Sequence, residues 1–358
     1  MHLLAACLGI LVGHDIIDSM GVYYIIVALF TLLSLRVRRE WNASDCLAPS
    51  QTVCINGIFI LLVFVSHLGH LLLQPMGYEM SHLLDKVYLK IHSTHGQLIV
   101  VPFLFYSGYG VATQMMNKPG YLASFLRNRA LPLWLNFLVA LACYLLVTVA
   151  FIGPVRVVDA AKSLVFLHAF GNPTWFLFCT MASYMVVWLA FKFMRGRFSI
   201  SAVCILGMLV YIGIVSRYRP IWWYDTALIF PIGVIVALYK DEVLSLASKR
   251  YWICSVAASI AFIIFFNLPW NHLGLYGACF RQNALGVLFM LIVMLFTMRI
   301  KVENKPLEWL GKHVFPIYMY HMLFFLCAKI LVGTSVGGGQ PFIGYECFCA
   351  DIDYRGLI

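Results

Sequence analysis

The chain has 358 residues, of which 62% are hydrophobic and only 11% are charged, and its mean hydropathy is +0.88. Soluble domains carry about 25% charged residues, so the composition excludes a soluble protein and predicts a polytopic membrane protein. The net charge of +10 comes from basic residues scattered between apolar runs. Because no basic stripe with interleaved aromatic residues is present, we expect no nucleic-acid partner.

The eleven cysteines raise the question of a disulfide framework or a metal site. Most of them stand singly inside apolar runs, where a cysteine behaves as a small hydrophobic residue. Near the end of the chain, Cys347 and Cys349 have no partner motif at zinc-site spacing. We therefore expect no metal and no permanently bound cofactor.

Apolar runs long enough to cross the hydrocarbon core predict an all-α fold, a polytopic bundle of about ten transmembrane helices. The first run ends near Leu35, and residues 1–40 are predicted to be a retained membrane segment, because the start of the chain lacks the basic region and cleavage site of a signal peptide. Residues 41–333 are predicted to form the main transmembrane domain, and residues 334–358 an irregular tail. The further predicted spans are 55–73, 96–114, 131–152, 174–194, 199–216, 224–239, 252–268, 284–299 and 313–333.

Basic residues set the predicted orientation. Three arginines between positions 36 and 39 follow the first span and place its end in the cytoplasm by the positive-inside rule. With alternating spans, the cytoplasmic loops hold 16 of the 25 Lys and Arg residues, against seven in the opposite loops. We therefore expect a multi-pass protein of the cell membrane. The outer loop 74–95 is partly amphipathic and is expected to lie along the membrane interface.

Two histidines, His67 and His70, stand near the outer end of the span 55–73. They are three residues apart and share a helix face, and an ionisable group inside a membrane usually faces the bundle interior and has a function there. Imidazole can act as a general base toward a hydroxyl group. The spacing leaves open a simpler alternative, a pair of interfacial histidines bonded to loop carbonyl groups.

The next span contains FLFYSGYGV, which places Ser107 and Tyr109 in one turn near its cytoplasmic end. The small residues of this segment are equally explained by close packing of neighbouring helices. Arg127 and Arg129 follow, just before Pro132 at the start of a new helix. Two guanidinium groups on the cytoplasmic side suit the phosphates of a soluble donor and suit lipid headgroups equally well.

The last span carries a histidine of its own. His321 lies mid-membrane and shares a helix face with Tyr318, three residues earlier. On the outer side, Trp175 and Trp223 belong to a group of aromatic residues that we interpret first as an interface belt and second as platforms for a sugar ring.

Six segments in this order resemble the acyltransferase family 3 of membrane proteins. They are the helix that ends in His67, then FLFYSGYGV, FLRNRALPLW, NPTWFLFCTMASYM, WWYDTALIFPIGVIVALYK and LGKHVFPIYMYH. Each segment is a weak signal alone, and the resemblance depends on their order and orientation over residues 55–325.

The resemblance implies transfer of an acyl group, most often acetyl, from a cytoplasmic acyl-CoA to a hydroxyl group of an extracytoplasmic or lipid-linked glycan. By position, His67 is expected to be the catalytic base or acyl relay, with His321 as the second catalytic residue. The residues expected at the acyl-CoA donor are Arg127, Arg129, Ser107 and Tyr109. Those expected at the acceptor are His70, Trp175, Trp223 and Tyr318. The implied partners are membrane lipids, the acyl-CoA and the glycan.

Two features depart from the family pattern. Asn56 stands eleven residues before His67, where the family usually has an arginine, so the missing charge is expected to come from the arginines at 36–39 or to be lost. After Gly333 the tail lacks the final apolar helix that the pattern predicts, as in a truncated or frame-disrupted C-terminus. Two other classes of function stay open: a transporter or flippase of glycans or small solutes, and an inactive remnant of the family. Repeated halves would favour the transporter, and none is evident in the sequence.

Overall fold

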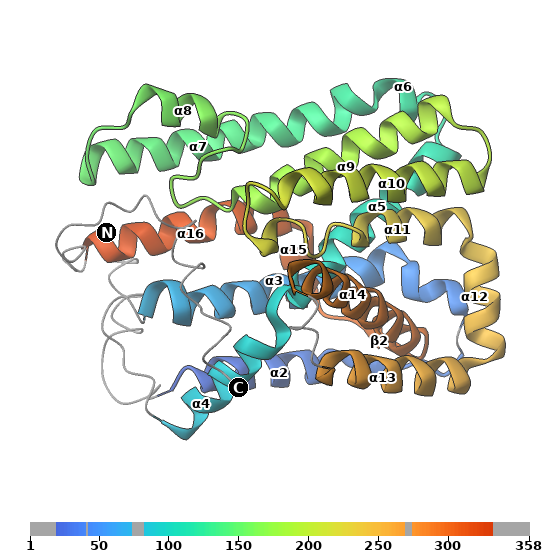
Figure 1. Cartoon of the computed structure of the whole chain (residues 1–358). Coiled ribbons are helices and arrows are strands. Elements are labelled where there is room, and N and C mark those ends of the chain that lie inside the picture. The colour runs from blue at the N-terminus through green and yellow to red at the C-terminus, as the bar shows by residue number, and fades with distance from the viewer. Residues whose placement is uncertain (1–18, 41, 74–81, 269–273, 332–358) are drawn as a thin grey trace.

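The computed structural model describes residues 19–40, 42–73, 82–268 and 274–331, and Figure 1 shows the chain as layers of helices. The structure is 82% helical, which confirms the predicted all-α class. The α-helices are α2 (Gly21–Leu33), α3 (Pro49–His67), α4 (Leu83–His95), α5 (Val101–Asn117), α6 (Tyr121–Phe125), α7 (Leu131–Phe151), α8 (Val157–Ser163), α9 (Thr174–Phe193), α10 (Arg197–Val215), α11 (Ile229–Leu238), α12 (Lys240–Lys249), α13 (Tyr251–Asn267), α14 (Gly274–Arg299), α15 (Lys305–Lys312) and α16 (Val314–Leu331). The shorter elements are the 3₁₀-helices η1 (Ala43–Leu47), η4 (Gly96–Ile99) and η6 (Ile221–Trp223), the π-helices η2 (Leu68–Leu73) and η5 (Leu126–Ala130), and the strands β1 (Leu35–Val37) and β2 (Ile300–Val302). Residues 1–18 of the predicted N-terminal segment and the predicted tail, residues 334–358, lie outside the described residues.

The predicted count of about ten spans is not confirmed. Six described helical segments are long and apolar enough to cross a membrane, and the number rises to seven if α12 and α13, bent by 97° where they meet, count as one span. The six are 49–73, 121–151, 174–193, 197–215, 274–299 and 314–331. The difference arises because other apolar runs form shorter helices. Helices α2, α5 and α11 have 13, 17 and 10 residues, fewer than the roughly 20 that cross a hydrocarbon core.

Proline fixes where four of the helices begin. Pro49, Pro102, Pro132 and Pro306 stand in the first turns of α3, α5, α7 and α15. A proline in the first turn loses no helical hydrogen bond and sets the backbone angle that a helix needs. These prolines therefore determine where along each helix the later side chains lie.

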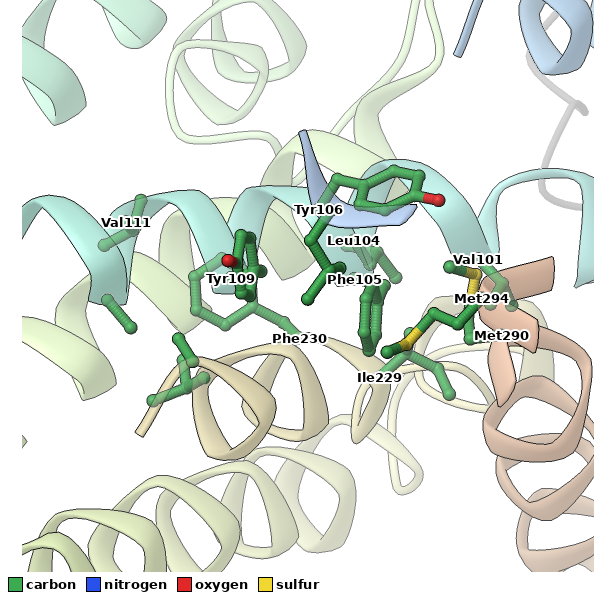
Figure 2. Packing of buried hydrophobic residues seen from close by; sticks show 14 of the residues in the cluster. Val101, Leu104, Phe105, Tyr106, Tyr109, Val111, Ile229, Phe230, Met290 and Met294 are labelled. Atoms are coloured by element: carbon green, nitrogen blue, oxygen red, sulfur yellow. The ribbon is translucent and has the colours of Figure 1, made fainter. Parts of the chain in front are cut away.

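Helices α5 and α11 pack with their backbones in direct contact. A Cβ on Gly108 would lie 2.1 Å from the carbonyl oxygen of Phe230, and one on Gly233 would lie 2.2 Å from that of Phe105. Figure 2 shows the surrounding cluster, to which Phe105, Phe230 and Met290 of α14 belong. Close packing is therefore the role of Gly108, and this contact anchors the helix that carries Ser107.

Helix α16 lies between α3 and α7 in Figure 1 and contacts both. Helix α15 leads into α16 and packs on the first half of α3 through two glycines. A Cβ on Gly57 would lie 2.1 Å from the carbonyl oxygen of Leu307, and one on Gly311 would lie 1.8 Å from that of Val53. These contacts fix the start of α16 relative to α3.

The arginines after α2 tie together loops that are predicted to be cytoplasmic. Strands β1 and β2 pair antiparallel, with Arg36 opposite Lys301. Nη1 of Arg38 lies 3.1 Å from Oδ2 of Asp45, and its Nη2 donates to Oε1 of Gln51 at 3.0 Å. Arg38 therefore holds the loop that leads into the first turn of α3.

Candidate active site

Helices α3 and α16 bring two histidines into direct contact. His67 is the last residue of α3, and His321 lies near the middle of α16. Nδ1 of His67 is 2.7 Å from Nε2 of His321, and the two rings stack with their centroids 5.0 Å apart. The side chain of His321 is only 3% exposed. The two residues predicted to be catalytic thus form one pair inside the bundle, and their chemical roles stay a prediction.

The carbonyl groups around His321 define where the protons of a neutral pair lie. Nδ1 of His321 is 2.8 Å from the carbonyl oxygen of Tyr318 and 3.2 Å from that of Ile317. Because a carbonyl oxygen only accepts, Nδ1 carries the proton and Nε2 carries the lone pair. His67 must then donate from Nδ1, which leaves its own basic lone pair on Nε2. In this neutral arrangement His67 donates to His321 within the pair, and the assignment of His67 as the base stays a prediction.

The end of α3 that carries His67, which is predicted to be the outer end, is held by helix α4, part of the predicted outer loop. The hydroxyl of Tyr88 donates to the carbonyl oxygen of Ser66 at 2.9 Å, and the hydroxyl of Ser66 lies 3.0 Å from Nδ1 of His92. The π-helix η2 begins directly after His67, and π-helical turns are frequent at functional sites. His70 lies in η2, but its side chain is outside the described residues.

A cavity of about 510 Å³ opens beside α3, toward the end of the helix that is predicted to be cytoplasmic. Its charged lining residues are Arg129 and Lys312, and no acidic residue is among the described residues that line it. Uncharged polar groups also line it, among them Thr52, Asn56, Ser107, Asn128, Asn136 and Thr180. Its apolar lining includes Phe103, Leu133, Phe176, Leu177, Val314 and Phe315. The cavity is therefore a basic site with an apolar wall.

Arg129 is positioned in the cavity by a tyrosine of α9. Nε of Arg129 donates to the hydroxyl oxygen of Tyr184 at 3.2 Å, and its guanidinium carbon lies 6.0 Å from the centre of the same ring. The hydroxyl of Ser107 is 3.2 Å from that of Tyr184. The π-helix η5 carries Arg129 and ends where α7 begins. These contacts use one edge of the guanidinium group, and its remaining N–H groups point to an anion as their natural partner.

Two buried polar atoms in the cavity wall have no hydrogen-bond partner. They are Oδ1 of Asn56 and the hydroxyl oxygen of Tyr106. Buried polar atoms are costly when unsatisfied, and such exceptions often mark the place of a ligand or water. The two residues therefore add unsatisfied hydrogen-bonding groups to the wall of the cavity.

The cavity and the histidine pair lie along the same side of α3. Thr52, Asn56, Ile60, Val63 and His67 are spaced four, four, three and four residues apart, which puts them on one helix face. Asn56 and His67 are eleven residues apart, or about 16 Å along the axis.

A packed layer separates the cavity from the histidines. Ile60 and Val63 are each 1% exposed, and they belong to one buried cluster with Tyr318. The ring of Tyr318 lines the cavity and lies 5.1 Å from the ring of Phe176 and 5.9 Å from that of His321. Tyr318 therefore contacts both the cavity and the pair.

The other residues predicted for the site lie elsewhere. Arg127 is exposed and does not line the cavity. Tyr109 is buried in the core between α5 and α11, as Figure 2 shows. Trp175 is partly buried beside Phe176, and Trp223 is 3% exposed with the guanidinium group of Arg219 stacked 4.5 Å from its ring centre. Of the predicted donor residues, the structure brings together Ser107 and Arg129.

Sequence reasoning did not single out Tyr184 or Lys312 as site residues. Tyr184 lies inside the segment NPTWFLFCTMASYM, and Lys312 directly precedes His313 in LGKHVFPIYMYH. For Lys312 the available signal is a charge at a helix end beside a predicted site, whereas Tyr184 lies in the middle of α9 and only its hydroxyl group within an apolar run could have indicated it. Asn56 was noted as a departure and proves to line the cavity.

In the part of the chain that the structure describes, no group of three or more His, Cys, Asp or Glu side chains could hold a metal ion. The eight cysteines described there are all free thiols.

Comparison with known proteins gives one match. Residues 54–344 match the acyltransferase domain of acyltransferase family 3, which is most of the chain. No curated protein and no solved structure matches the chain. The matched range contains the histidine pair and every residue named above as lining the cavity except Thr52. The chain therefore belongs to acyltransferase family 3, a family of multi-pass membrane acyltransferases.

Proposed function

We propose that this protein transfers an acyl group, acetyl in the first place, from a cytoplasmic acyl-CoA to a hydroxyl group of an extracytoplasmic or lipid-linked glycan in the cell membrane. The observation that carries the proposal is the pair of partly buried His67 and buried His321, which lies beyond a basic cavity on the same face of α3. A base and an anion-binding cavity are the two parts that acyl transfer from a phosphorylated thioester needs.

The donor side of the proposal rests on the charge of the cavity. An acyl-CoA carries several phosphate charges at one end and a thioester at the other. Arg129 presents a guanidinium group whose geometry suits phosphate oxygens. The apolar wall with Phe103 and Phe176 would receive the less polar thioester arm. The thioester reaches His67 once the ring of Tyr318, which belongs to the layer between the cavity and the pair, and the neighbouring ring of Phe176 move aside.

The chemical step uses the proton arrangement of the pair. Nε2 of His67 takes the proton of the acceptor hydroxyl while the hydroxyl oxygen attacks the thioester carbonyl carbon. A new C–O bond forms, the C–S bond breaks, and the sulfur leaves as a thiol after receiving the proton from His67. The charge that builds on His67 is stabilised by its Nδ1–H hydrogen bond to His321. The products are an ester of the sugar and free CoA.

Labelled acetyl-CoA tests the proposal directly. The purified protein in detergent is incubated with acetyl-CoA carrying a labelled acetyl group, and thioester cleavage and label transfer are followed. We expect His67→Ala to lower turnover by at least about a hundredfold, the usual contribution of a general base. His313→Ala is the matched control, since Nδ1 of His313 lies 2.7 Å from the carbonyl oxygen of Trp309 in α15, outside the pair and the cavity lining.

Unchanged turnover in His67→Ala would remove this residue from its role. Failure of the wild-type protein to bind any CoA ester would favour an inactive member of the family. Flux of a solute through proteoliposomes without an acyl donor would favour a transporter. The acceptor is identified by mass spectrometry of surface glycans from cells with and without this chain, scanned for a lost acyl mass.

A further inference from the structure

Lys312, the last residue of α15, is the second cation that lines the cavity. Its Nζ lies 2.5 Å from Oε1 of Glu308, one turn earlier on the same helix. The two side chains are 59% and 46% exposed. An exposed ion pair between residues four apart is weak, so the ammonium group can exchange its partner at little cost.

The backbone that carries Lys312 is fixed, although the side chain is exposed. Gly311 and Gly57 lie at the contact of α15 with α3, where a Cβ on either would meet a backbone carbonyl oxygen at 1.8 Å or 2.1 Å. Such contacts leave no room for the helix to shift. The stem of Lys312 therefore starts at a defined place at the cavity rim, beside the turn of α3 that carries Thr52 and Asn56.

The rest of the cavity is suited to an anion with further polar groups. Arg129 supplies the other positive charge, and no acidic residue is found among the lining residues that the structure describes. The unpartnered hydroxyl of Tyr106, a residue only 8% exposed, and the unpartnered Oδ1 of Asn56 lie in the same wall. Two cations, with no acidic residue among the described lining residues, favour an anionic occupant such as a phosphate ester, and Asn56 and Tyr106 add polar groups beside it.

We infer that Lys312 exchanges the carboxylate of Glu308 for a phosphate oxygen of the donor, so that Lys312 and Arg129 together hold the donor's phosphates. The inference rests on the proposed function, because it takes the donor to be an acyl-CoA. It adds that Glu308 competes with the donor for the same ammonium group. Lys312 is thus a donor-binding residue, and Glu308 sets how strongly it binds.

Binding of CoA to the purified protein in detergent tests this inference, with calorimetry at two or more salt concentrations as the readout. We expect Lys312→Met to weaken CoA binding about tenfold at low salt and to flatten its salt dependence, because one charge-assisted hydrogen bond is lost. Glu308→Gln should act in the opposite direction and tighten CoA binding about twofold to threefold, because the competing carboxylate is gone. Lys305→Met, on an exposed lysine two turns earlier that does not line the cavity, should leave binding unchanged.

A donor without phosphate tests whether Lys312 acts through its charge on the donor's phosphates. S-acetylpantetheine carries the thioester but no phosphate, so Lys312→Met should leave turnover of this short donor unchanged. Equal CoA affinity of Lys312→Met and wild type would overturn the assignment of Lys312 and leave the proposed function standing. If Glu308→Gln binds CoA no more tightly than wild type, Glu308 does not compete with the donor for Lys312. If wild-type protein binds no CoA at any salt concentration, the proposed function fails and this inference fails with it.

Discussion

Arg129 of the π-helix η5 donates a hydrogen bond from Nε to the hydroxyl of Tyr184 on α9, across 3.2 Å. Tyr184 is 3% exposed, and its ring packs against Phe125 and Phe230. A rigid, buried tyrosine thus sets the direction of a guanidinium group at the edge of the cavity. The side chain that is proposed to meet the donor is held in place before the donor arrives.

Removal of the Tyr184 hydroxyl should weaken donor binding without abolishing it. Tyr184→Phe keeps the ring under the guanidinium group but loses the acceptor for Nε of Arg129. We expect the KM for acetyl-CoA to rise about fivefold, the effect of one hydrogen bond of about 1 kcal/mol, with little change in kcat. Steady-state kinetics checks this. Tyr211→Phe is the control, because its hydroxyl donates to the carbonyl oxygen of Trp223, outside the cavity. A KM shift of the same size in Tyr211→Phe would show a general effect on stability.

His321 should behave as a positioning residue for His67. His321→Ala removes the acceptor for the Nδ1 proton of His67, and we expect turnover to fall by about tenfold to a hundredfold, the range seen when a group that orients a functional side chain is lost. The substitution also leaves a space of imidazole size beside His67. Added imidazole should therefore restore part of the activity of His321→Ala and none of that of His67→Phe, where the space is filled. Turnover at the wild-type level in His321→Ala would contradict the proposal that the hydrogen bond to His321 positions His67 as the base.

Two glycines of the segment SGYG should respond in opposite ways to the same substitution. A Cβ on Gly108 would lie 2.1 Å from the carbonyl oxygen of Phe230, whereas a Cβ on Gly110 would meet no atom within 4 Å. Gly108→Ala should lower stability by about 1–3 kcal/mol through overpacking. Gly110→Ala should raise it by about 0.5–1 kcal/mol, since alanine favours the helix. Thermal unfolding in detergent compares the two. Equal melting temperatures would show that α5 and α11 do not meet at this contact.

Cys46 should be unreactive in the folded protein. Its side chain is fully buried in η1, and burial raises the pKa of its thiol to about 12. At pH 8 about one thiol in 10⁴ is then ionised, and only the thiolate reacts with iodoacetamide. Labelling should rise only as the pH approaches 12 or as the protein unfolds. Peptide mass spectrometry after labelling at pH 8 measures the modified fraction of Cys46.

Arg38 should control the access to Cys46. Arg38→Ala leaves Asp45 and Gln51 without the guanidinium group that ties them together, so η1 should loosen and labelling of Cys46 at pH 8 should increase. Arg36→Ala is the matched control, since the side chain of Arg36 donates only to the carbonyl oxygens of Leu33 and Leu35 in its own segment. Similar labelling in both variants would contradict the structural role assigned to Arg38.

Hydropathy and charge predicted the class of fold because they depend on local composition. An imidazole is conspicuous inside an apolar run, so His67 and His321 could be singled out from the sequence. Their contact could not be, because 254 residues separate them and the contact depends on how α16 packs between α3 and α7. The number of spans was not confirmed for a related reason: apolar runs such as 224–239 give a helix of only ten residues, α11, after a turn at Trp223 and Tyr224.

The residues of the proposed donor site could likewise be predicted only in part. Ser107 and Tyr109 lie in one turn, and the sequence cannot tell which side of α5 faces a cavity. The structure turns Ser107 toward the cavity and Tyr109 into the core against α11. Lys312 was missed because its place beside Asn56 follows from the packing of Gly311 on α3, a contact between residues more than 250 positions apart.

The layer formed by Ile60, Val63 and Tyr318 bears on whether protons can leak across the membrane through this protein. Two imidazoles in line between water on both faces would pass protons one to the other and discharge the membrane's electrochemical gradient. Tightly packed side chains lie between the cavity and the histidines, and this packing would keep a continuous file of water from forming between them. In the proposed reaction, the donor's thioester arm would fill the space that it opens as it moves Tyr318 aside. A protein that works as proposed would thereby hold a proton-transfer site within the membrane without letting protons cross it.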